Sequence, residues 1–98
     1  MDHRTTLKIC NRRGLHARAS ARFVQTVERF DARVDVSREG QTVGGTSIMG
    51  LMMLAAGPGT TIDVAASGPE AREVLEALSA LVDDAFGETE RVDVSGDP

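Results

Sequence analysis

The sequence predicts an α+β fold in which helices cover one face of an antiparallel sheet. Three segments alternate apolar and polar residues with a period of two, as strands with one buried and one solvated face do. Such alternation favours antiparallel pairing, because parallel strands buried on both faces are apolar throughout. Helical segments with an apolar stripe separate the strands, and the resulting order is βαββαβα. At 98 residues the chain has the size of one domain.

Four strands are expected, each with its apolar residues on one side. The second and third strands form a hairpin, because Arg38–Gln41 has the composition of a turn. Cys10 ends the first strand, and as the single cysteine it is expected to be a buried thiol without a disulfide. The strands are predicted over residues 5–10 with Leu7 and Ile9, 32–37 with Val34 and Val36, 41–44, and the segment of Ile62, Val64 and Ala66.

The first helix begins near Arg18, just after His16. From Arg18 onward, a step of about 100° per residue separates a charged stripe from an apolar face, which predicts an amphipathic helix. His16 therefore lies where a loop meets a helix N-terminus, whose free backbone amides attract anions. Arg18 can reach the same region, and Arg22 lies one turn further along the same face of the helix. One guanidinium group can bind two phosphate oxygens at once. The opposite face contains Ser20, Phe23, Val24 and Val27.

Spacing alone leaves two interpretations of His16 open. It is either a nucleophile that carries a phosphoryl group, which the nearby arginines neutralise, or an ordinary polar residue on a solvated helix face. A metal site is not expected, because no carboxylate or cysteine stands at ligand spacing from His16. The other histidine, His3, is assigned no role.

The middle helix, over residues 47–54, is apolar nearly all round. Leu51 and Leu54 point one way, while Ile48 and three methionines point mostly the other way. Such a helix is either a buried core segment or a surface for a partner. Three helices and four short strands cannot surround a central helix, so we expect an exposed patch, for which flexible methionines are suited. Ser47, the first residue of this segment, is predicted to be the N-cap of the helix.

The last helix is predicted to start with Ser67 as its cap residue, with Pro69 in the first turn and Gly87 at its end. Its apolar residues keep helical spacing throughout. Residues 88–98 are polar. The prediction is therefore a domain over residues 1–87 followed by a polar tail over residues 88–98.

Composition excludes several classes of function. The net charge of −4 and the absence of Tyr and Trp argue against a nucleic-acid-binding domain. The basic residues on which such a domain would depend are Arg12, Arg13, Arg18, Arg22 and Arg29. No apolar run approaches the roughly 20 residues that cross a bilayer, and no signal-peptide core follows the N-terminus, so we expect a cytoplasmic protein with no membrane contact.

Two motifs resemble one known family. The stretch GLHARAS at 14–20, followed by TSIMGLMML at 46–54, resembles HPr, the histidine-containing phosphocarrier of the bacterial phosphotransferase system, over residues 5–86. The resemblance implies an open-faced β-sandwich with three helices on a four-stranded antiparallel sheet. It also implies a phosphoryl relay that is not itself an enzyme, uses no cofactor and is a monomer. His16 would take a phosphoryl group on its pros nitrogen from enzyme I and pass it to an enzyme IIA domain.

The same resemblance assigns roles to other residues. Arg18 would act beside the phosphohistidine, and Ser47 would be the regulatory serine modified by HPr kinase/phosphorylase. Partner docking would involve Ile48, Met49, Met52 and Arg22. The usual motif has proline where this chain has Ala19. The alternative is a regulatory binding module in which Ser47 matters and His16 does not, and the choice between sugar transport and nitrogen or carbon regulation stays open.

Overall fold

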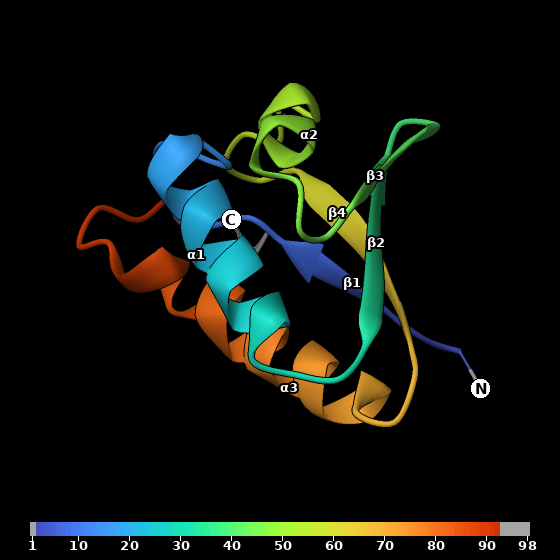
Figure 1. Ribbon diagram of the computed structural model, residues 1–98. Helices are drawn as coiled ribbons and strands as arrows, with labels where there is room; N and C mark the ends of the chain where they lie inside the picture. The colour runs from blue at the N-terminus through green and yellow to red at the C-terminus, as the bar shows by residue number, and fades with distance from the viewer. Residues whose placement is uncertain (1, 93–98) are drawn as a thin grey trace.

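Four antiparallel strands form a single sheet, and the structure, a computed structural model, describes residues 2–92 (Figure 1). The strands lie in the order β1-β4-β2-β3. The elements follow the predicted order βαββαβα, which confirms the fold class. Their bounds are β1 His3–Lys8, α1 Ala17–Glu28, β2 Arg33–Arg38, β3 Gln41–Gly44, α2 Ile48–Met53, β4 Thr61–Ser67 and α3 Ala71–Asp83, with a 3₁₀ turn over Ala85–Gly87.

The helices cover one face of the sheet and leave the other face open. Figure 1 shows α1 and α3 side by side against the strands, with α2 near the upper end of α1. The apolar face of α1 and the inward residues of the strands meet in one core, and Phe23, Val36, Ile62 and Leu78 are fully buried there. Within residues 2–92, no helix is both long enough and apolar enough to span a bilayer.

The predicted hairpin turn is present between β2 and β3. Arg38 pairs with Gln41, so only two residues make the turn. Glu39 has φ 51° and Gly40 has φ 81°, which is the pattern of a type I′ turn. The right-handed twist of the two strands matches this turn type, so the local sequence and the sheet agree.

The first strand starts and ends earlier than the predicted range 5–10. Ile9 lies beyond β1 but still exchanges two backbone hydrogen bonds with the loop before β4, from Ile9 N to Thr60 O (2.9 Å) and from Gly59 N to Ile9 O (2.8 Å). Cys10 is only partly buried, so the prediction of a buried thiol was wrong. Its thiol donates to the carbonyl of Val82 at the end of α3 (3.3 Å), a polar contact that holds it at the edge of the core.

Helix α3 starts later than predicted, because Ser67 is not its cap. Ser67 is the last residue of β4 and pairs with Arg33, and Gly68 turns the chain with φ 107°. Glu70 occupies the N-cap position and its carboxylate accepts a hydrogen bond from Asp31 N at 2.7 Å, so it ties the helix start to the α1–β2 loop. The α-helix ends at Asp83, and Gly87 ends the 3₁₀ turn instead.

Helix α2 exposes the side that was predicted to be exposed. Leu51 is fully buried, whereas 71% of Met49 is accessible to solvent. The alternative of a central core helix was therefore wrong. Ser47 is the N-cap, as predicted, and its hydroxyl accepts a hydrogen bond from Gly50 N at 3.0 Å. The exposed apolar side chains, which we call the α2 patch, are Ile48, Met49, Met52 and Met53.

The start of the predicted tail packs against the loop that follows β1. Arg12 N donates to Glu90 O (3.1 Å) and Val92 N donates to Cys10 O (2.9 Å), so residues 88–92 run antiparallel to residues 10–12. Residues 93–98 lie outside the described part of the chain. The domain boundary at residue 87 stays a prediction.

Candidate functional site

The loop between β1 and α1 is fixed by a close backbone approach at Gly14. Gly14 has φ 67°, and a Cβ atom there would lie 2.4 Å from the carbonyl oxygen of Ala56. The next residue, Leu15, donates its N–H to that same carbonyl at 2.9 Å. Only glycine fits both the backbone conformation and the contact. The loop that carries His16 is therefore held against the segment leaving α2.

His16 is the N-cap residue of α1, but its side chain does not cap the helix. Its backbone is extended, with φ −75° and ψ −178°, and its ring bonds to none of the helix amides. The first amide bonded within the helix is that of Ser20, which donates to His16 O at 2.9 Å. The amides of Ala17, Arg18 and Ala19 therefore have no carbonyl of their own helix to bind. This is the geometry of an anion site.

One ring nitrogen of His16 is occupied and the other is not. Nε2 lies 2.6 Å from Oε2 of Glu88, and only 16% of each side chain is accessible to solvent. Nδ1 bonds to no group within residues 2–92. Because an ionised carboxylate has no proton to donate, the hydrogen of this contact belongs to Nε2. Nδ1 then carries the lone pair, which makes it the nucleophilic atom.

Glu88 is held from two sides. Its Oε1 accepts a hydrogen bond from Nδ2 of Asn11 at 3.1 Å. Burial by itself raises the pKa of Glu88, but the hydrogen bonds from Asn11 and His16 and the charges of His16 and Arg13 lower the pKa below its ordinary value on balance. The carboxylate is therefore ionised at neutral pH.

Arg18 and Arg22 lie at the same surface hollow as His16, as the sequence led us to expect. The hollow has a volume of about 320 Å³. Arg22 is partly engaged already, because its guanidinium donates to the carbonyl of Phe86. Gly87 makes room for it, since a Cβ atom at Gly87 would lie 2.5 Å from Nη1 of Arg22. The residues around the hollow are Arg13, His16, Arg18, Arg22, Gly87, Glu88, Thr89 and Glu90.

Arg12 and Arg29 do not extend this cluster into a basic stripe. Arg12 is exposed and pairs with Glu90 at 3.1 Å. Arg29, at the far end of α1, lies over the ring of Phe30 at 5.6 Å. Within the described residues, no group of three His, Cys, Asp or Glu side chains is placed to hold a metal ion.

Two residues of the site, Asn11 and Glu88, were missed from the sequence. Asn11 is fully buried and also donates to Gly14 O at 2.9 Å, so it braces the loop from inside. The signal for Asn11 was a polar residue directly after an apolar strand. Glu88 is 72 residues from His16 and stood in a segment predicted to be a tail, and no local pattern connects the two.

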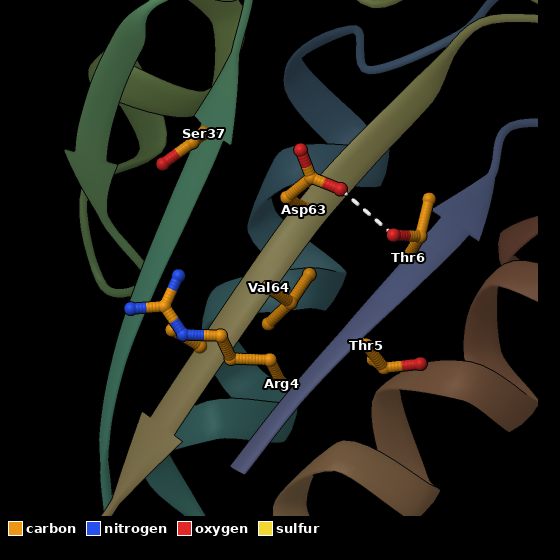
Figure 2. A pocket seen from close by; sticks show the side chains of 7 residues that line it. Arg4, Thr5, Thr6, Ser37, Asp63 and Val64 are labelled. Atoms are coloured by element: carbon orange, nitrogen blue, oxygen red, sulfur yellow. Dashed lines mark hydrogen bonds between the residues drawn. The ribbon is translucent and has the colours of Figure 1, made fainter. Parts of the chain in front are cut away.

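A second hollow, of about 350 Å³, lies on the open face of the sheet, away from His16. Figure 2 shows Arg4, Thr6, Ser37 and Asp63 around it, with Thr6 donating to Asp63 at 2.8 Å. The bond between Thr6 and Asp63 joins the neighbouring strands β1 and β4. It contains no histidine or cysteine nucleophile and is a solvated sheet surface.

Comparison with known proteins connects this geometry to a family. The family described as the PTS HPr component phosphorylation site matches residues 3–84. The phosphocarrier protein HPr of Cupriavidus necator is 49% identical over 82 residues, which are 84% of this chain and 92% of that protein. HPr of Neisseria meningitidis serogroup A is 46% identical over 85 residues, which are 87% of this chain and 96% of that protein.

Solved structures agree with these matches. A crystal structure of HPr from Thermoanaerobacter tengcongensis superposes with a TM-score of 0.84 at 37% identity, covering 88% of this chain and 97% of that one. HPr from Bacillus anthracis superposes with a TM-score of 0.79 at 41% identity, covering 83% and 96%. The chain thus belongs to the HPr family, the phosphocarrier proteins of the phosphotransferase system, which carry a phosphoryl group and are not enzymes.

Proposed function

We propose that His16 accepts a phosphoryl group on Nδ1 from enzyme I and passes it to an enzyme IIA domain. One observation carries this assignment: His16 occupies an N-cap position whose side-chain cap is missing, with Nε2 held by Glu88 and Nδ1 free. A phosphoryl group on Nδ1 would supply the acceptor oxygens that the first helix amides lack.

Each transfer is a displacement at phosphorus. The lone pair of Nδ1 forms the new N–P bond while the bond between phosphorus and the donor breaks, and the donor takes the electron pair. Arg18 and the amides of Ala17, Arg18 and Ala19 stabilise the negative charge on the phosphoryl oxygens. Ala19 stands where the usual motif has proline, and unlike proline it has an N–H to offer. Passage to the acceptor is the same displacement in reverse.

The α2 patch is proposed as the docking surface for the protein partners. Its apolar side chains are exposed together, which is unusual for residues of this kind on a small domain. In this proposal Ile48, Met49 and Met52 contact the partner from α2, and Arg22 contacts it from the hollow that also contains His16. The close contact of Gly14 and Leu15 with Ala56 supports this proposal, because it holds the loop that carries His16 against the segment that follows α2.

Ser47 is proposed as a regulatory phosphorylation site for HPr kinase/phosphorylase. Its hydroxyl is at the exposed start of α2 and beside the patch. A phosphate adds about −1.5 to −2 charges, and a helix N-terminus tolerates negative charge, so the fold is expected to be little affected. The charge would instead hinder an apolar or acidic partner surface. We also assign the protein to the cytoplasm as a monomer, and its mass in solution tests the second part.

Radioactive phosphoenolpyruvate and purified enzyme I test the relay. We expect one acid-labile, alkali-stable label per chain, which is lost in His16→Ala and kept in the matched control His3→Ala. No label on the wild-type protein would instead favour the regulatory binding module.

A second experiment tests the role of Ser47. Transfer from enzyme I to Ser47→Asp should be weaker than transfer to Ser47→Asn, because both side chains cap helices well and only Asp adds a charge. Equal transfer to the two variants would contradict regulation through docking.

A further inference from the structure

We propose that Glu88 is a positioning residue for phosphoryl transfer: it holds the proton of His16 on Nε2 and balances the positive charge that the ring gains when Nδ1 binds phosphorus. This inference rests on the proposed function of His16. Glu88 lies beyond residue 84, where the match to the family model ends, so that match assigns it no role.

The carboxylate of Glu88 has a dedicated donor in the core. Nδ2 of Asn11 donates one hydrogen to Gly14 O at 2.9 Å and the other to Oε1 of Glu88 at 3.1 Å. Asn11 is fully buried, and its Oδ1 has no hydrogen-bond partner among the described residues. Leaving a buried acceptor unpaired is costly. The side chain nevertheless keeps this orientation, because a flipped amide would point its oxygen at two other acceptors, the Gly14 carbonyl and the Glu88 carboxylate.

The backbone on both sides of Glu88 is also fixed. Before it, the guanidinium of Arg22 binds the carbonyl of Phe86, and Gly87 leaves space for that guanidinium. After it, Arg12 N donates to Glu90 O, so the chain runs back along the loop after β1. Figure 1 shows this last segment next to the start of α1. The carboxylate of Glu88 is therefore held in a fixed position beside the His16 ring.

The chemistry follows from the position of the proton. When Nδ1 forms its bond to phosphorus, the bond between phosphorus and the donor breaks, the donor keeps that electron pair, and the proton stays on Nε2, so the ring becomes a cation. Glu88, accepting the Nε2–H bond at 2.6 Å, stabilises that cation in the same way as the carboxylate of a catalytic triad stabilises an imidazolium. A protonated phosphohistidine is also the better phosphoryl donor, because the departing ring leaves neutral. Glu88 thus assists both directions of transfer.

Other charged groups also line the hollow around the ring, so the test must separate their effect from that of Glu88. From the loop and α1, Arg13, Arg18 and Arg22 line the hollow, and from the C-terminal segment Glu90 does so together with Glu88. Glu90 is exposed and already pairs with Arg12, so it is the matched control: Glu90→Gln removes the same charge from the same hollow without touching the ring.

Nitrogen-15 NMR of His16 tests the proton position without any phosphoryl transfer. In the wild type and in Glu90→Gln, the Nε2–H tautomer of the neutral ring should dominate. In Glu88→Gln, the ratio of the Nε2–H tautomer to the Nδ1–H tautomer should fall about tenfold. A hydrogen bond from Nε2–H to a charged acceptor favours that tautomer roughly ten times more than a bond to a neutral acceptor does. An unchanged ratio would overturn the proposal. Amide spectra show that each variant is folded.

Transfer kinetics provide the second readout. At neutral pH the rate from phosphorylated enzyme I to Glu88→Gln should fall roughly tenfold and the rate to Glu90→Gln should stay within about twofold of the wild type. A normal rate in Glu88→Gln, with a normally labelled wild type, refutes the role of Glu88 and leaves the phosphocarrier function intact. If the wild type takes no label, the proposed function fails, and the tautomer ratio still decides whether Glu88 sets the proton position.

Discussion

Replacing Gly14 by alanine should destabilise the protein far more than the same change at Gly40 or Gly57. Two costs combine at this position. Alanine at φ 67° costs about 1–2 kcal/mol, because its Cβ crowds the carbonyl in the left-handed region. The Cβ would also lie 2.4 Å from the carbonyl oxygen of Ala56, so the two loops must separate and the Leu15 N to Ala56 O bond of 2.9 Å must lengthen.

Together these effects give a loss of about 3–4 kcal/mol in the free energy of unfolding, taking overpacking strain and one weakened hydrogen bond at about 1 kcal/mol each. For a chain of this size that corresponds to a fall in Tm on the order of 15 °C. Alanine substitutions at two further glycines allow the two costs to be measured separately. Gly40→Ala meets only the conformational cost, with φ 81° and nothing within 4 Å, and should lose about 1–2 kcal/mol. Gly57→Ala meets neither cost and should be close to neutral.

Urea denaturation monitored by circular dichroism measures all three variants on one scale. The expected order of stability is Gly57→Ala, then Gly40→Ala, then Gly14→Ala. The reasoning would be refuted if Gly14→Ala lost no more stability than Gly40→Ala, because the close approach to Ala56 would then add nothing to the loss in free energy of unfolding. The folded fraction of Gly14→Ala should also accept phosphoryl groups more slowly, since its His16 loop is displaced.

Three further predictions concern stability. Ser47→Ala should lose about 1 kcal/mol in urea denaturation while Ser47→Asn keeps wild-type stability, because only alanine leaves the α2 cap unfilled. Glu39→Asn should gain about 0.5 kcal/mol and raise Tm, since asparagine adopts φ 51° in a type I′ turn more readily than glutamate does; a lower Tm would contradict this. Glu88 has a lowered pKa, so its contribution is present above its ordinary value of 4.5 and is lost as the pH falls through the lowered value. The Tm difference between wild type and Glu88→Gln should therefore be present at pH 7 and disappear in acid.

The sequence predicts the elements whose signal is local. Alternation located the strands and periodicity located α1, because each depends on one buried face. The size of the domain correctly decided the exposure of the α2 patch. Errors occurred where a tertiary contact overrides a local signal. Ser67 and Pro69 have the composition of a helix start, yet Ser67 pairs with Arg33 in the sheet. The N-cap is Glu70 instead, which accepts a hydrogen bond from Asp31.

Half of the candidate site follows from local sequence and half does not. His16 and Arg18 lie in one loop and helix start, so their spacing brings them together. Glu88 reaches His16 only because the 3₁₀ turn after α3 redirects the chain. In that turn Ala85 and Phe86 have positive φ, 53° and 55°, and neither residue type predicts such a conformation. The polar composition of residues 88–98 predicted a tail, but composition does not indicate the direction in which the chain continues.

The sheet order has a consequence for how the chain folds during synthesis. Strand β4 pairs with β1 on one side and β2 on the other, so neither β1 nor the β2–β3 hairpin joins a larger sheet before residues 61–67 leave the ribosome. Until then the apolar faces of α1 and of the early strands have no layer to cover them. The long loop closure between β1 and β4 makes this pairing slow relative to local helix formation. The nascent chain therefore exposes these apolar faces until β4 is available, and it then folds as one cooperative unit.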